Sequence, residues 1–276
     1  MAQMKTPGVY IIEKNAFPNS VVEVATAIPA FIGHTQFARD GNKDLTGIPF
    51  RISSMAEFHS FFGFAPTLRF GIRPEDSESE DTTNDINVLF PDGSCQLTLP
   101  KTFYALYYNM LLFYANGGGP CYIVSIGDYE HDFKSIDFTN ALLALKKEQE
   151  PTLVVVPEAV YMEEGDCYKV QTAALMHCGN DMKNRFAILD VFNGYKDENG
   201  AVIKSFRENI GSNFLAYCAS YYPWINTSIV TEKDITFYNI EKDSLEKLEE
   251  LILNEFSKKS GVTNEAVNEL MDKFKL

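Results

Sequence analysis

The sequence predicts an α/β fold, in which a mixed sheet is flanked by helices and carries an extended N-terminal arm and a small inserted β/loop lobe. Two observations favour this class. From about residue 103 onward, short apolar runs rich in β-branched residues alternate with helical patterns, as in successive β-α-β units. These runs are apolar at nearly every position, which is typical of strands in a sheet covered on both faces. With 276 residues, of which 45% are hydrophobic, the chain can bury one large core or two smaller ones.

The composition argues against several classes of protein. A formal net charge of -14 opposes nucleic-acid binding, because contacts with phosphates require clustered lysine and arginine. The sequence has no apolar run of about 18 residues and no signal-peptide core, so we expect cytoplasmic assembly without direct membrane insertion. The cysteines are odd in number and lack C-x-x-C spacing, so we expect reduced thiols. They are Cys95, Cys121, Cys167, Cys178 and Cys218.

Residues 1–24 predict an extended arm rather than part of the core. A turn signal at Thr6–Gly8 precedes a short β-prone run. Pro7 and Pro18 would be poorly tolerated in a central strand, so we expect the arm to lie at a sheet edge or to pair with another chain. Its candidate inter-subunit residues are Val9, Tyr10, Ile11 and Ile12.

Residues 25–240 are expected to form the core domain. Its first strand is predicted at residues 28–33, and a helix over residues 54–62 would be capped by Ser53 and ended by Gly63. An insertion at about 65–100 is punctuated by glycine and proline, which predicts a loop or small β-lobe. Six acids in it could bind calcium but lack the spacing of a calcium loop, so a solvated acidic loop is favoured. They are Glu75, Asp76, Glu78, Glu80, Asp81 and Asp85.

The stretch from Phe103 to Ile126 predicts a central helix, a glycine turn and a buried strand. Aromatic and aliphatic residues occupy almost every position up to Ala115, so we expect this helix to be buried on most of its circumference. Phosphate-binding loops have the order strand, glycines, helix, because the anion binds at a helix N-terminus. Here Gly117 to Gly119 follow a helix C-terminus instead. The glycines are therefore predicted to turn the chain, and no cofactor is predicted.

Helices and strands are predicted to alternate through the rest of the core domain, each helix starting at an aspartate or serine. The predicted helices start at Asp137, Asp166 and Ser205, and the strands cover residues 152–156, 186–191 and 215–221. Residues 241–276 predict a separate helical segment, in which Ser244 caps a helix with one apolar face and Thr263 is a candidate start of a second. The apolar face consists of Leu245, Leu248, Leu251, Ile252 and Phe256.

Few residues suggest chemistry. Asp190 lies near the end of a predicted strand, where open α/β sheets often place functional groups, but it has no evident catalytic partner and a structural role is favoured. Cys167, His177 and Cys178 are zinc-ligand types, yet the adjacent pair points in different directions on a helix and no second cluster completes four ligands. The remaining histidines are isolated in the sequence. We therefore predict no catalytic residue and no metal site.

Four segments, in this order, resemble the contractile tail sheath family of contractile phages and phage-tail-like injection systems. The resemblance spans residue 6 to about residue 230, and the four motifs are specific only jointly. They are Thr6 to Ile11, Ala27 to Gly33, Phe113 to Val124 and Ala219 to Trp224.

The resemblance implies a non-enzymatic structural subunit that packs in six-fold rings around an inner tube and contracts to drive the tube. Its partners would be further copies of itself, the inner tube protein, and baseplate and terminal cap proteins. Val9–Ile12 would belong to an arm that joins the sheets of neighbouring subunits. In the family, a C-terminal half beyond Trp224 completes the sheet and supplies a second arm. Residues 241–276 are helical in pattern instead, so we expect a truncated connecting region or a short form.

Two alternatives stay open at this point. One is a related accessory tail component, such as an initiator or a cap, which joins the assembly without forming the whole sheath. The other belongs to a different class, an α/β enzyme that uses Asp190.

Overall fold

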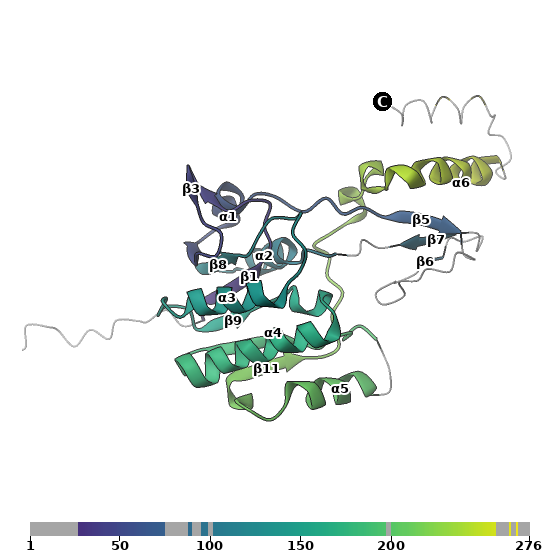
Figure 1. Cartoon of the computed structure of the whole chain (residues 1–276). Helices are drawn as coiled ribbons and strands as arrows, with labels where there is room; N and C mark the ends of the chain where they lie inside the picture. Colours follow the sequence, from purple (N-terminus) through teal and green to yellow (C-terminus); the bar gives the residue numbers. More distant parts are fainter. Residues whose placement is uncertain are drawn as a thin grey trace, which may run out of the picture.

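The computed structural model describes residues 27–74, 88–89, 95–98, 102–196 and 200–257, together with residues 265 and 269. The predicted arm, including Val9–Ile12, and the acidic residues from Glu75 to Asp85 lie outside these ranges. A six-stranded mixed sheet with the strand order β11-β10-β9-β1-β8-β4 forms the body and confirms the predicted α/β class (Figure 1). Its strands are β1 (Pro29–Gly33), β4 (Phe50–Ile52), β8 (Cys121–Ser125), β9 (Leu153–Val155), β10 (Phe186–Asp190) and β11 (Cys218–Tyr221).

Five of the six strands are parallel, and only β4 pairs antiparallel, with β8. Numbered in chain order, the parallel strands lie in the sequence 2-1-3-4-5, which is a doubly wound arrangement. The central strand β1 pairs with β8 on one side (Ile32 opposite Val124) and with β9 on the other (Ala30 opposite Val154). The chain therefore reverses its direction across the sheet at β1, and the carboxyl ends of β1 and β9 flank the topological switch point.

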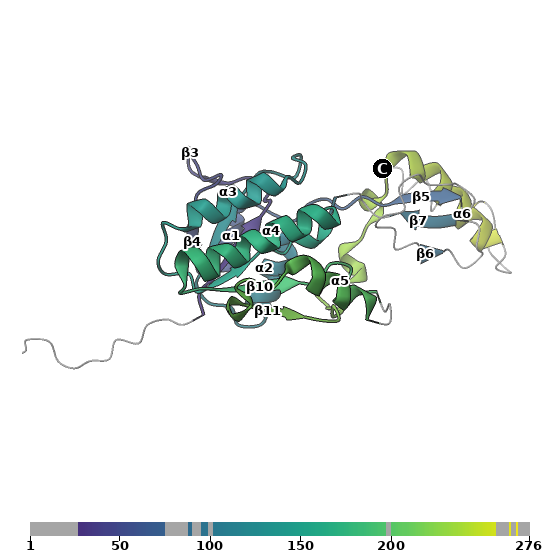
Figure 2. The same ribbon diagram turned by 60° about the horizontal axis from the view of Figure 1, so that its bottom comes forward.

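The helices cover the two faces unequally. On one face, α3 (Ser135–Leu145), α4 (Glu164–Met176) and α5 (Ala201–Ile210) lie side by side (Figure 2). On the other face, α1 (Met55–Phe62) and α2 (Leu106–Ala115) pack over β1, β8 and β4. Alternate residues of β1 enter different cores, because successive side chains of a strand point to opposite faces. Ile32 is buried beneath α3 and α4, and Phe31 is buried beneath α1 and α2.

Several predicted helix starts are wrong by a few residues: α3 and α4 each begin two residues before the predicted caps Asp137 and Asp166, which lie in their first turns, and neither helix has a side-chain cap. The Ser54 hydroxyl accepts a hydrogen bond from Glu57 N at 3.2 Å, so Ser54 rather than Ser53 caps α1. The helix predicted to start at Ser205 is α5, which begins at Ala201 and ends at Gly211, where φ is +75°. Because a glycine at positive φ ends a helix readily, Gly211 sets the end of α5.

The glycine turn after α2 is confirmed as a helix-capping turn. Gly117 has φ of +82°, and the amides of Gly117 and Gly118 donate to the carbonyls of Tyr114 and Phe113. The prediction that α2 is buried on most of its circumference is wrong, since only Leu106, Tyr107 and Met110 are fully buried. The helix lies on the sheet surface, and its outer side is half-exposed.

The insertion and the C-terminal segment build one small lobe together. The insertion forms a three-stranded antiparallel sheet of β5 (Gly71–Pro74), β7 (Cys95–Thr98) and β6 (Val88–Leu89), which projects from the body (Figures 1 and 2). The C-terminal segment lies along β5: Phe70 N donates to Asn239 O at 2.7 Å, and Glu241 N donates to Phe70 O at 2.9 Å. The helix predicted after Ser244 is α6 (Leu245–Ser257). A separate hairpin of β2 (Arg39–Asp40) and β3 (Lys43–Asp44) follows β1.

Candidate functional sites at the sheet ends and edges

The topological switch point contains a buried, hydrogen-bonded histidine–glutamate pair. His34 follows β1 directly and Glu158 follows β9 by three residues, so both side chains lie at the carboxyl ends of neighbouring strands. His34 Nδ1 is 2.7 Å from Glu158 Oε2, and the side chains are 1% and 0% exposed. In doubly wound sheets this crevice is the usual position of a bound ligand. Here the protein's own carboxylate and imidazole occupy it.

Glu158 joins three parts of the chain through its two carboxylate oxygens. Oε2 also accepts a hydrogen bond from His34 N at 2.9 Å, and Oε1 accepts one from Leu106 N at 3.2 Å. Leu106 is the first residue of α2, and the preceding Ala105 supplies no side-chain cap. A carboxylate at a helix N-terminus satisfies free amides and interacts favourably with the helix dipole. Glu158 therefore acts as a cap supplied to α2 from a distant segment.

Gly33 makes room for this arrangement at the end of β1. A Cβ atom on Gly33 would lie 2.9 Å from Leu106 Cβ and 3.0 Å from Glu158 Oε1. Both distances are too short for ordinary contacts, so any larger residue would displace the Glu158 carboxylate or α2.

Aromatic rings enclose the imidazole. The His34 ring stacks on Phe133 with centroids 4.9 Å apart, and it makes edge contacts with Tyr104 at 5.2 Å and Phe138 at 6.0 Å. Burial raises the pKa of the Glu158 carboxyl, and the hydrogen bonds from His34 and Leu106 offset part of that rise. The pair is packed and hydrogen-bonded like a structural core element, and it presents no open side to a substrate.

Asp190, the candidate catalytic acid, ends β10. Its backbone carbonyl accepts a hydrogen bond from Gln171 Nε2 at 2.6 Å, and burial raises the pKa of its carboxyl. Burial and, secondarily, the Asp190 charge raise the pKa of the Tyr161 hydroxyl to about 12. Within the described ranges, no histidine or second carboxylate is hydrogen-bonded to the Asp190 side chain. The geometry thus brings no acid–base partner to this residue.

The zinc-ligand types do not assemble into a metal site. His177 Nε2 is 3.0 Å from Arg185 Nη1, and burial together with the Arg185 charge lowers the pKa of His177 to about 4. Burial raises the thiol pKa of Cys167 and of Cys178 to about 12, so both remain protonated. No group of three or more potential metal ligands occurs in the described part of the chain.

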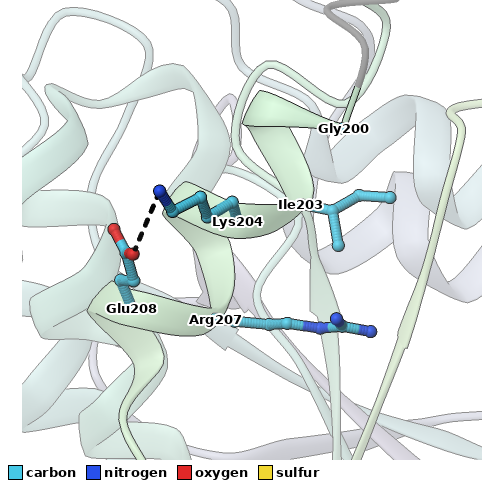
Figure 3. Close-up of a pocket in the computed structure, with 5 residues that line it drawn as sticks. All are labelled: Gly200, Ile203, Lys204, Arg207 and Glu208. Carbon is cyan, nitrogen blue, oxygen red and sulfur yellow. Dashed lines mark ion pairs between the residues drawn. The ribbon is translucent and has the colours of Figure 1, made fainter.

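A shallow hollow of about 530 Å³ lies on the outer surface of α5 (Figure 3). Lys204 Nζ lies 3.9 Å from Glu208 Oε1 at one side of it, and Ile203 and Arg207 project to the other side. All of its lining residues belong to α5 or to Gly200 just before it, so the hollow cannot enclose a ligand as an active-site cleft does. These residues are Gly200, Ile203, Lys204, Arg207 and Glu208.

The two edges of the main sheet differ. The edge strand β4 has three residues, and its exposed Arg51 pairs with Glu150 at 3.2 Å, features that disfavour pairing with another strand. At the opposite edge, β11 pairs with β10 and has no strand partner on its outer side among the described residues. Tyr221 at the end of β11 is 68% exposed. The open edge of the sheet is thus β11.

The chain after β11 is anchored back onto the body. Trp224 N donates to Gly194 O at 2.9 Å, and the indole Nε1 donates to Val191 O at 3.0 Å. A Cβ atom on Gly194 would lie 2.5 Å from Trp224 Nε1, so glycine is needed beneath the indole ring. Tyr222 adds a hydrogen bond from its hydroxyl to Lys196 O at 3.1 Å. The motif from Ala219 to Trp224 therefore forms the open strand and the fixed turn that follows it.

Comparison with known proteins identifies no relative, since neither a family model nor a curated protein matches the chain. Of the helices described, none is long and apolar enough to cross a membrane.

Proposed function

We propose that this chain is a structural subunit of a contractile sheath around the inner tube of a phage tail or injection particle, polymerising into stacked six-fold rings. The observation that carries the proposal is the open parallel edge of β11, which lies directly before the anchored turn at Trp224. In the family that the sequence resembles, the chain beyond the segment equivalent to Trp224 completes the sheet. An edge with unpaired backbone groups is suited to receive a strand from a neighbouring subunit.

The proposed link is the addition of an arm to this edge. Val9–Ile12 supplies a β-prone run, and Pro7 and Pro18 confine pairing to the residues between them. Backbone hydrogen bonds would supply affinity, and each subunit would both donate an arm and receive one. Such heterologous contacts close into rings or continue into helices, depending on the rotation between subunits.

The filled switch point is consistent with a structural role. His34 and Glu158 take the place in which a doubly wound sheet binds a ligand, and they tie β1, β9 and α2 together. A body cross-linked in this way can rotate as a unit while the links between subunits are kept.

An accessory tail component, an initiator or a cap, is the second candidate. It is favoured by the path of the chain after Trp224, which leaves the sheet and joins the lobe instead of adding a strand. A cap would form single rings at the end of a tube, whereas a sheath subunit would form long tubes.

The arm hypothesis is tested by deleting residues 1–24. We expect the body to fold normally, because few apolar core positions lie in this stretch of the sequence, while sedimentation should show that assembly is lost. The substitution Gln3→Ala, outside the β-prone run, is the matched control and should assemble as the parent does. Unchanged assembly by the deletion variant would count against the arm as the link.

A further inference from the structure

One face of the main sheet is covered only in half. A single row of side chains crosses this face, because Ile123, Phe31, Val155, Ile188 and Ala219 are register partners on successive parallel strands. The first three pack in the core beneath α1 and α2. Ile188 and Ala219 belong to neither hydrophobic core and are only half-buried. The part of this face that α1 and α2 cover therefore ends between β9 and β10.

The same division appears along β10. Ala187 and Leu189 point to the face beneath α3, α4 and α5 and are buried in that core. Phe186 and Ile188 point to the other face and remain half-exposed. The strand is apolar at four of its five positions, and its second face belongs to neither hydrophobic core. We call this area the open face; it consists of Leu153, Phe186, Ile188, Ala219 and Tyr221, with Asp190 beside Tyr221 at its end.

The open face is about as wide as one helix with its side chains. Three strands at the usual spacing span about 10 Å, and five residues along a strand span about 16 Å. A helix with its side chains is about 10 Å wide.

The α-helix that follows β11 in the chain, α6, lies at the lobe and does not cover the open face (Figure 1). In a doubly wound sheet, the helix that follows the last parallel strand usually returns over the sheet. Here the next α-helix after β11 is α6, and the intervening chain leads it to the projecting lobe (Figures 1 and 2). Ile72 N donates to Ser244 Oγ at 2.9 Å and Glu241 N donates to Phe70 O, so α6 is held at the lobe.

An apolar stripe on α6 remains incompletely covered there. Leu245, Leu248 and Ile252 are spaced by three and four residues and therefore lie on one side of the helix. Leu245 is 38% exposed, and the other two are half-buried. With 13 residues, α6 is about 20 Å long, which is enough to span the open face.

We propose that α6 of a second copy of this chain docks on the open face, with its apolar stripe against Phe186 and Ile188. Each copy carries both a helix that projects from its body and a face that lacks one, so the same element can be exchanged between copies. The contact uses side chains of a sheet face and not the backbone edge of β11. It therefore does not rest on the sheath proposal.

Cross-linking of two variants, each with one added cysteine, tests the docking. The parent carries Cys218→Ala, because the other four native cysteines are buried. One variant adds Ile188→Cys and the other adds Leu248→Cys; the two are mixed and treated with a short bis-maleimide. We expect a cross-linked dimer that contains one chain of each kind. The control replaces Ile188→Cys by Lys169→Cys, at an exposed position of α4 on the opposite face, and should give at least tenfold less product.

A second variant guards against non-specific collisions and misfolding. Phe186→Lys, added to the Ile188→Cys chain, should lower the cross-link yield about tenfold while circular dichroism shows an unchanged fold, because Phe186 lies outside both cores. Leu143→Lys, at an exposed apolar residue of α3, should not lower the yield.

Equal yields from the Ile188 and Lys169 positions, or no dimer at all, would overturn the docking. Repeating the experiment with the chain that lacks residues 1–24 separates the two proposals. Loss of polymers with retention of the cross-link would count for both the arm and the docked helix. A cross-link that disappears together with the arm would overturn the docking as an independent contact.

Discussion

The Glu158 side chain connects three elements of the body through hydrogen bonds. Its carboxylate accepts hydrogen bonds from His34 N and Leu106 N and pairs with the His34 ring, so β1, β9 and α2 meet at two oxygen atoms. Removing one member of a buried pair leaves the other groups desolvated without partners, which costs more than the pair itself contributes.

We therefore expect Glu158→Ala to lower the free energy of unfolding by about 3–5 kcal/mol, since it leaves two amides and an imidazole without their acceptor. Glu158→Gln keeps one acceptor oxygen and should cost less. Urea denaturation measures both. Glu208→Ala is the control, because this exposed acid pairs with Lys204 on the surface of α5. A Glu158→Ala variant no less stable than the control would contradict the proposed cap.

His177 makes stability depend on pH. Burial and the Arg185 charge lower its pKa from 6.5 to about 4, so the folded state favours the neutral ring. The resulting stability is fully present above pH 6.5 and is lost as pH falls toward 4.

The expected loss over this range is about 3 kcal/mol of unfolding free energy. His177→Gln should flatten the dependence between pH 6.5 and 4, because glutamine does not titrate. His131→Gln is the control, since His131 is exposed and paired with Asp128 at the surface. If the His177 variant kept the full slope, another group would be responsible.

At the level of elements, the sequence predicts most of the body because apolar runs and capping residues act locally. The runs around Ile32, Ile123, Val154 and Ile188 are β1, β8, β9 and β10, and Gly117 ends α2 as expected. The start of α5 is missed because Ser205 is a good capping residue that lies inside the helix. The second face of the sheet is predicted to be covered because the β10 run is apolar at four of its five positions, yet it is only half covered.

The buried pair is not predictable from local pattern. His34 and Glu158 are 124 residues apart, and only the strand order places their strand ends together. His34 looks isolated in the sequence for this reason. The only sequence feature that His34 and Glu158 share is that each follows the end of an apolar run, and this feature is too common to predict a contact. The pairing of the insertion with the C-terminal segment is hidden in the same way, since Ile72 and Ser244 are 172 residues apart.

The β11 edge gives an element-scale prediction. Tyr221→Lys places a charge at the end of the open strand, and lysine on an edge strand disfavours pairing with another strand. We expect a folded protein whose assembly is at least tenfold weaker by sedimentation. Ile136→Lys, at an exposed residue on α3, should assemble normally. Equal effects of the two substitutions would show that added charge, and not the edge, weakens assembly.

At the level of the whole molecule, the described chain is an α/β body with one open sheet edge and one half-covered face, and a lobe projects from it (Figures 1 and 2). Within the described residues, the β11 edge has no strand partner on its outer side, and the open face belongs to neither core. The ligand position filled by His34 and Glu158 and the incomplete surfaces are consistent with the proposed role in assembly. Its net charge of -14 requires that such contacts be specific enough to overcome mutual repulsion.

Electron microscopy of the purified full-length chain tests the central claim most directly. A sheath subunit should form hollow tubes or stacked rings with six-fold symmetry, and these should be absent from the variant that lacks residues 1–24. Single rings without tubes would favour the cap or initiator. Monomers at high concentration that turn over a substrate, with activity lost in Asp190→Asn, would contradict the account.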